Sequence, residues 1–102
     1  MLTLTQALAS FAQNSRNFIE AERLYTQYAE VARKCGREES EATAFHQLGR
    51  VAQERRDFDA AESWYNKALE IFERYDDQHS VDVVRHSLAR LKNDIDSEGQ
   101  LI

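Results

Sequence analysis

Proline is absent from the 102-residue sequence, and glycine occurs only three times. Because proline breaks helices and glycine disfavours them, this scarcity argues against a loop-rich or disordered chain and favours helix. The single cysteine, Cys35, has no partner for an intramolecular disulfide, which fits a reducing compartment. No apolar run approaches the roughly 20 residues that span a bilayer, and the N-terminal segment lacks the basic start of a secretory signal. We therefore expect a cytoplasmic protein without a membrane partner.

The charge balance and the missing motifs exclude further function classes. The chain has 18 acidic and 13 basic residues, a formal net charge of −5, which disfavours a nucleic-acid partner. The sequence has no glycine-rich phosphate loop, no paired cysteines and no spacing typical of a Ser, His and Asp triad. We therefore expect no enzymatic activity, no metal and no cofactor. A chain of this length is expected to form one domain, 1–102.

The central stretch, residues 45–72, carries two helical patterns separated by a polar turn. Small residues occur in both, with Gly49 and Ala52 in the first pattern and Ala61 and Ala68 in the second. A residue with almost no side chain allows two helices to cross closely. This arrangement predicts a helical hairpin.

The hairpin pattern recurs along the chain. Phe18 corresponds to Phe58, and Tyr25 corresponds to Tyr65, at a shift of 40 residues. A second shift of the same size aligns only one further helix before the chain ends. The expected organisation is repeat 1 at about 2–41, repeat 2 at about 42–81, a C-terminal capping helix at about 78–96 and a loose tail at 97–102.

The hairpin resembles a tetratricopeptide repeat, in which Trp-x-x-Leu-Gly-x-x-Tyr opens the first helix and two alanines flank an aromatic residue in the second. Phe45 stands in place of the Trp, Ala52 replaces the Tyr, and the closing Pro is missing. The period exceeds the family's usual length of about 34, so the repeats are extended, with HEAT-like repeats as the alternative. The matching residues are Leu48, Gly49, Ala61, Tyr65 and Ala68.

This resemblance implies an all-α fold of antiparallel helical hairpins, stacked as a short right-handed α-solenoid of five helices. Asn17 followed by Glu20 predicts a capping box, in which the Asn side chain accepts from a free backbone amide and the Glu reaches back. Asp57 predicts a second cap, and Gly36 a left-handed stop. The expected helices are 2–14, 17–34, 38–54, 57–75 and 78–95.

The resemblance further implies a protein–protein interaction scaffold that holds a partner peptide or helix in its concave groove. The first helix of each repeat lines that groove, and its outward positions lie at spacings of three and four. The two His and two Arg side chains among them suit a partner with acidic groups, because Arg holds carboxylates bidentately and His adds charge below about pH 6.5. The predicted groove residues are Gln6, Ser10, Gln13, Thr43, His46, Arg50, Gln53, His86, Arg90 and Asn93.

A solvated, idle face is the alternative for this strip. Glu54 lies four residues after Arg50, and Asp94 has the same relation to Arg90. Each Arg would then form a weak local pair along its own helix.

Self-association is the alternative function. Leu4, Phe11 and Tyr28 predict an apolar face at the N-terminal end, which would form a homodimer or contact a further repeat of a longer array. The alternative, which we favour for Tyr28, is that its side chain fills space left by the shorter first repeat. A protein that stays monomeric at all concentrations would exclude the homodimer.

Overall fold

The computed structural model describes residues 17–100, with side chains to Glu98. These residues form four α-helices and no strand. The all-α prediction is therefore confirmed for this part of the chain, with four helices where five were expected overall. The first expected helix, 2–14, lies outside the described residues. The helices are α2 (Phe18–Lys34), α3 (Glu38–Glu54), α4 (Phe58–Arg74) and α5 (Gln78–Gln100).

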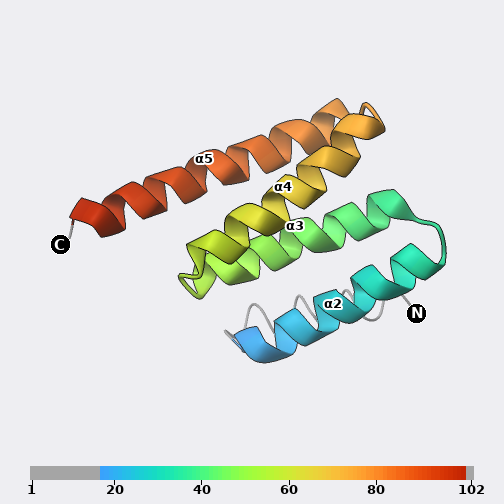
Figure 1. Cartoon of the computed structure of the whole chain (residues 1–102), viewed down its shortest axis with the longest axis horizontal. Helices are drawn as coiled ribbons and strands as arrows, with labels where there is room; N and C mark the ends of the chain where they lie inside the picture. Colours follow the sequence, from blue (N-terminus) through green and yellow to red (C-terminus); the bar gives the residue numbers. More distant parts are fainter. Residues whose placement is uncertain (1–16, 101–102) are drawn as a thin grey trace.

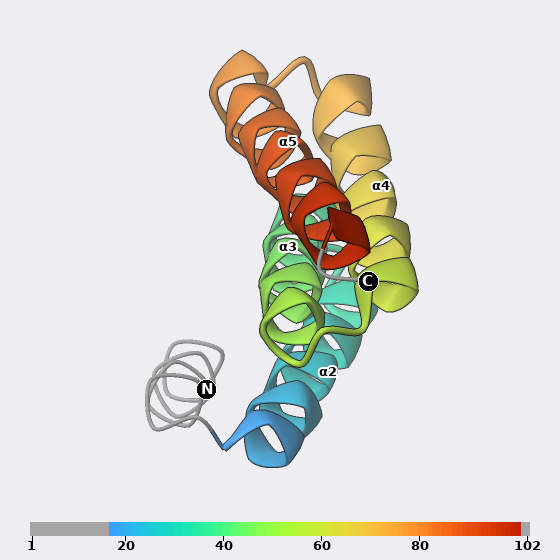
Figure 2. The same cartoon turned by 90° about the vertical axis from the view of Figure 1, so that its left-hand side faces the viewer.

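Consecutive helices lie side by side and antiparallel, in the order in which the chain makes them (Figure 1). Seen edge-on, α3 and α5 lie toward one side of this row and α4 toward the other (Figure 2). As a result α3 and α5 touch each other directly, although α4 separates them in the sequence. The side chains on α3 and α5 can therefore form one surface.

Each of the three turns between helices contains one residue in the left-handed conformation, namely Gly36 (φ 72°), Arg56 (φ 67°) and Asp76 (φ 55°). In the first turn the amide of Gly36 donates to the carbonyl three residues earlier at 3.1 Å, and the amide of Arg37 donates to the carbonyl five residues earlier at 2.8 Å. The same pair of bonds closes the other two turns. This is the Schellman arrangement, which satisfies carbonyls at a helix end.

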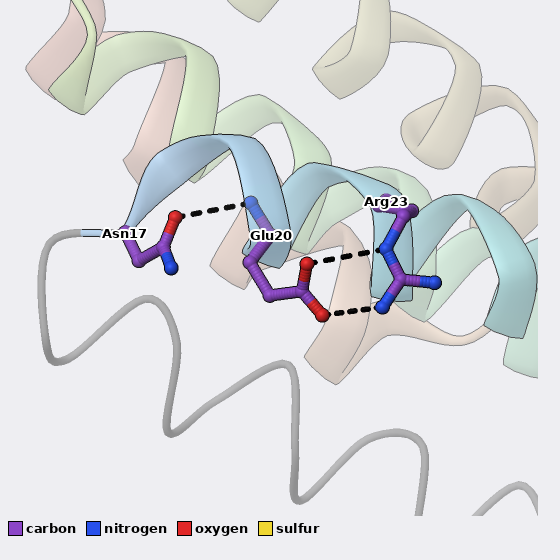
Figure 3. Close-up of polar contacts among 3 residues, drawn as sticks. All are labelled: Asn17, Glu20 and Arg23. Carbon is purple, nitrogen blue, oxygen red and sulfur yellow. Dashed lines mark hydrogen bonds and ion pairs between the residues drawn. The ribbon is translucent and has the colours of Figure 1, made fainter.

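Side-chain caps start three of the four helices. The side chain of Asn17 accepts from the amide of Glu20 at 3.3 Å, as predicted (Figure 3). Asp57 accepts from the amide of the residue three positions later, also at 3.3 Å. Asp77 repeats the cap on the amide of Ser80 at 3.2 Å. Each cap satisfies one of the backbone donors that a helix start leaves free.

The second half of the predicted capping box is wrong. The carboxylate of Glu20 turns away from Asn17 and forms two contacts with the guanidinium of Arg23, one turn further along α2 (Figure 3). An arginine one turn away offers a charged, bidentate partner, which the backbone amide of Asn17 does not.

The two helices of the central hairpin cross closely at Gly49. A Cβ atom built on this residue would stand 2.5 Å from two carbon atoms of the Tyr65 ring, which is fully buried. Tyr25 is buried in the same way between α2 and α3, at the position 40 residues earlier. Phe45 stacks on Trp64 beside this crossing, with ring centroids 5.5 Å apart. The predicted close approach of the helices therefore occurs at the residues that predicted it.

The last helix is longer than expected. We predicted its end near Ile95 and a loose tail from residue 97, but α5 continues to Gln100. Glu98 forms an ion pair with Arg56 in the turn between α3 and α4. This contact joins the final turns of α5 to the turn between α3 and α4.

Candidate functional site

The predicted groove residues that the structure describes lie on α3 and α5, two helices in direct contact. His46 Nε2 lies 2.8 Å from Ser87 Oγ, and Gln53 Nε2 donates to Asp94 Oδ2 at 2.6 Å. The two contacts are seven residues apart on each helix, which is about two helical turns. They join α3 to α5 directly.

The hydrogen-bond roles at the first contact depend on which ring nitrogen of His46 carries the proton. The hydroxyl of Ser87 lies 3.2 Å from the carbonyl of Val83, to which it donates when His46 carries its proton on Nε2 and donates to the Ser87 oxygen; with the proton on Nδ1, the hydroxyl donates to Nε2 instead. The hydroxyl of Ser87 is therefore already used within the protein.

Tyr65 of α4 contacts both of the α3 residues that bond to α5, His46 and Gln53. Its hydroxyl donates to Gln53 Oε1 at 2.8 Å, and its ring lies 5.5 Å, centroid to centroid, from the ring of His46. Burial raises the pKa of Tyr65 to about 12, against the opposing effect of the positive charges on Arg50 and Arg90. The tyrosine therefore stays protonated and keeps its hydrogen bond across the physiological range.

Two adjoining hollows open on this surface, of about 290 Å³ and about 490 Å³. Arg50, Ser87 and Arg90 line both of them, so we treat them as one feature, the α3–α5 trough. The remaining lining residues of the first hollow are Gln53, Glu54, Arg56, Tyr65 and Asp94. Those of the second are His46, His79, Asp82, Val83 and His86.

Glu54 and Asp94, the carboxylates that the sequence suggested as local partners of the two shared arginines, line the first hollow with them. Within residues 17–100, neither Arg50 nor Arg90 takes part in a salt bridge. Asp94 instead accepts a hydrogen bond from Gln53, across to the other helix. The third arginine of the trough, Arg56, is paired with a carboxylate of α5.

His46 does not provide the positive charge that was expected of it. Burial, together with the smaller effect of the nearby guanidinium of Arg50, lowers its pKa from 6.5 to about 4. The imidazole is therefore neutral near pH 7 and contributes hydrogen bonding and packing. The expectation that His46 becomes charged below about pH 6.5 is wrong, because the ring is half-buried. The sequence alone did not reveal this burial.

The other predicted groove residues have different places. Thr43 is half-buried, and its hydroxyl donates to the carbonyl of Glu39 at 3.0 Å, within its own helix. His86 lines the second hollow, whereas Asn93 is exposed and lines neither. The remaining three predicted residues, Gln6, Ser10 and Gln13, lie outside the described residues.

Sequence reasoning did not include Ser87 or His79 among the site residues. Ser87 follows His86 directly, and its partner His46 lies 41 residues earlier, one more than the repeat period. Pairing α3 with α5 at that offset would have found it.

Of the three residues predicted for self-association, Tyr28 is buried, with 8% of its surface exposed. It packs with Ala29, Ala44 and Phe45 where α2 meets α3, so it offers almost no surface to a second copy. Leu4 and Phe11 lie outside the described residues.

The comparisons with known proteins agree with this architecture. The family model for the tetratricopeptide repeat matches residues 1–74 and 41–93. The crystal structure of BtubC (BKLC) from P. vanneervenii superimposes with a TM-score of 0.80 at 26% sequence identity. That match covers 91% of this chain and 38% of the BtubC chain, so the sequence spans well under half of that protein. No curated protein matches the chain significantly.

Helices of the described region are too short or too polar to cross a membrane. The repeated helical hairpins, their close crossing at Gly49 and Tyr65, and the match of the family model over most of the sequence lead to one assignment. The chain belongs to the tetratricopeptide repeat family.

Proposed function

We propose that this chain is a non-enzymatic binding module that holds an acidic segment of a partner protein in the α3–α5 trough. Tetratricopeptide repeats generally mediate protein–protein interaction. The observation that carries the proposal is the position of Arg50 and Arg90. Both line the same trough, and both lack a salt bridge to any residue in 17–100.

The two arginines carry positive charge on a protein whose net charge is negative. The chain carries a net charge of −5, so the protein as a whole repels a partner with acidic groups. A trough with two available guanidiniums would orient such a partner and fix where it binds, because each guanidinium can hold a carboxylate through two parallel hydrogen bonds. Val83, with 41% of its surface exposed, adds an apolar contact beside them.

The test is binding of acidic and neutral synthetic peptide pools to the purified chain, followed by fluorescence anisotropy. We expect the acidic pool to bind, and the double variant Arg50→Glu with Arg90→Glu to lose that binding while its helical circular dichroism is unchanged. The matched control is Arg33→Glu with Lys92→Glu, which changes the net charge equally at exposed positions outside the trough. Equal losses in both double variants would mean that the trough is not the site.

Self-association remains the alternative function. It now depends on Leu4 and Phe11, since Tyr28 is buried. Light scattering over a range of protein concentrations tests it directly, because a homodimer would give a mass that rises with concentration. The cytoplasmic location also stays a prediction.

A further inference from the structure

Two guanidiniums, those of Arg50 and Arg90, line one trough, and neither forms a salt bridge with a residue in 17–100. Arg50 and Arg90 come from neighbouring helices, and they border both hollows. Each guanidinium has five N–H donors in a fixed planar arrangement. A partner group that reaches this space can therefore meet two cationic forks.

The third arginine of the trough, Arg56, is already paired with one carboxylate. Arg56 pairs with Glu98, and the single carboxylate occupies that single guanidinium. A carboxylate carries one negative charge, so one Asp or Glu side chain balances the charge of one arginine. Arg50 and Arg90 together exceed what one such side chain can satisfy.

Other donors in the trough are largely committed to the protein itself. The hydroxyl of Ser87 is bonded within the protein, to Val83 or to His46, and the amide of Gln53 donates to Asp94. His46 shares a hydrogen bond with Ser87 and stays neutral at physiological pH. The ligand is therefore selected chiefly by the two arginines. Three carboxylates of the trough oppose an anionic ligand, namely Asp82 in the second hollow and Glu54 and Asp94 in the first, so the second hollow is the more favourable place for it.

We infer that the group recognised by Arg50 and Arg90 is a phosphorylated side chain of the partner peptide, an inference that rests on the proposed function. A phosphomonoester carries about −1.5 to −2 charges at pH 7 and three acceptor oxygens arranged tetrahedrally. It can accept from two guanidiniums on different helices at once, which one carboxylate cannot do equally well. Binding would thus depend on the phosphorylation state of the partner.

The test uses three degenerate peptide pools that differ only in the central residue, which is phosphoserine, glutamate or serine. Affinity for the purified chain is measured by fluorescence anisotropy at one ionic strength. We expect the phosphoserine pool to bind about tenfold more tightly than the glutamate pool, the ratio that corresponds to about 1.4 kcal/mol. The serine pool should bind more weakly than both.

Two variants test whether the arginine forks are responsible. Arg50→Lys combined with Arg90→Lys keeps both charges but removes the planar forks, so the preference for phosphoserine over glutamate should fall several-fold. Asp82→Asn removes a repelling carboxylate from the trough and should strengthen binding of the phosphoserine pool more than that of the serine pool. Lys92→Gln is the matched control on an exposed position of α5 outside the trough, and should leave the preference unchanged.

The results separate this inference from the proposed function. Equal binding of the phosphoserine and glutamate pools would overturn the phosphate inference and leave the proposed function in place. Failure of every pool to bind would overturn both. A loss of the preference in Lys92→Gln as large as in the double lysine variant would show a general charge effect and would also overturn the inference.

Discussion

Gly49 of α3 lies against the ring of Tyr65 in α4, so closely that the helix crossing has no room for a methyl group. The ring cannot move away easily, because Tyr65 is fully buried and its hydroxyl is bonded to Gln53. The distance between the two helices of the hairpin is therefore set by the absence of a side chain at one position.

This contact predicts that Gly49→Ala is destabilising. In an exposed helix interior Ala is favoured over Gly by about 1 kcal/mol. A net loss of stability in Gly49→Ala would therefore be due to the clash of the new methyl group with the Tyr65 ring. We expect a net loss on the order of 1–2 kcal/mol in chemical denaturation, in the range of overpacked cores. In a Tyr65→Leu background the loss should shrink, because the ring is gone. A Gly49→Ala protein as stable as the parent would contradict the close crossing.

The left-handed turns predict a pair of opposite effects. Asp76 has φ 55°, a backbone conformation that is less favourable in free energy for a residue with a Cβ atom than for glycine. Asp76→Gly should therefore raise the free energy of unfolding by about 0.5–1 kcal/mol. Gly36→Ala places a side chain on the same conformation and should lower it by about 1 kcal/mol. No atom lies within 4 Å of a Cβ built on Gly36, so backbone strain alone is responsible. Thermal unfolding of both variants checks the signs.

The neutral, half-buried His46 predicts a loss of stability in acid. Its pKa falls from 6.5 to about 4 in the folded state. A group whose pKa is lowered by folding contributes stability that is present above pH 6.5 and is lost as the pH falls toward 4. The loss from this residue is at most on the order of 3 kcal/mol, and smaller to the extent that solvent screens the partly exposed ring.

His46→Gln should remove this part of the pH dependence, because glutamine does not titrate. The measurement is the free energy of unfolding of the parent and variant between pH 7 and pH 4. Parallel curves for the two proteins would show that His46 is not responsible.

The ion pair between Glu98 and Arg56 predicts that Glu98→Gln loosens the end of α5. Both side chains are well exposed, so global stability should change by less than about 1 kcal/mol. Amide hydrogen exchange at residues 97–100 should nevertheless become faster, because the contact that holds the final turn is weakened. Unchanged exchange there would mean that α5 needs no such attachment.

Local signals in the sequence predicted the helices well. The span of α3 agrees with the predicted 38–54, and the caps at Asn17 and Asp57 form as predicted. These features depend on residues within one or two turns of each other. The end of α5 could not be predicted in the same way, since its partner Arg56 lies 42 residues earlier in the chain.

The candidate site, too, could be predicted only where its features depend on residues close together in the sequence or on the repeat. The repeat placed His46, Arg50, His86 and Arg90 on neighbouring helices, and all four line the trough. The burial of His46 and the hydrogen bond from Gln53 to Asp94 depend on how closely α3 approaches α5, which no local pattern states. Composition shows which groups are available, whereas packing decides which of them remain charged and unengaged.

The equal spacing of the three left-handed turn residues has a consequence for how such a protein can change in length. The join between two hairpins is built like the join within a hairpin, as the matching turns at Gly36, Arg56 and Asp76 show. A tandem gene duplication could therefore insert a whole hairpin without requiring a new kind of connection. A single-residue insertion inside a helix would instead rotate everything after it by about 100° and carry its apolar stripe away from its neighbour. This architecture therefore accommodates the insertion of a complete hairpin more easily than the insertion of a single residue within a helix.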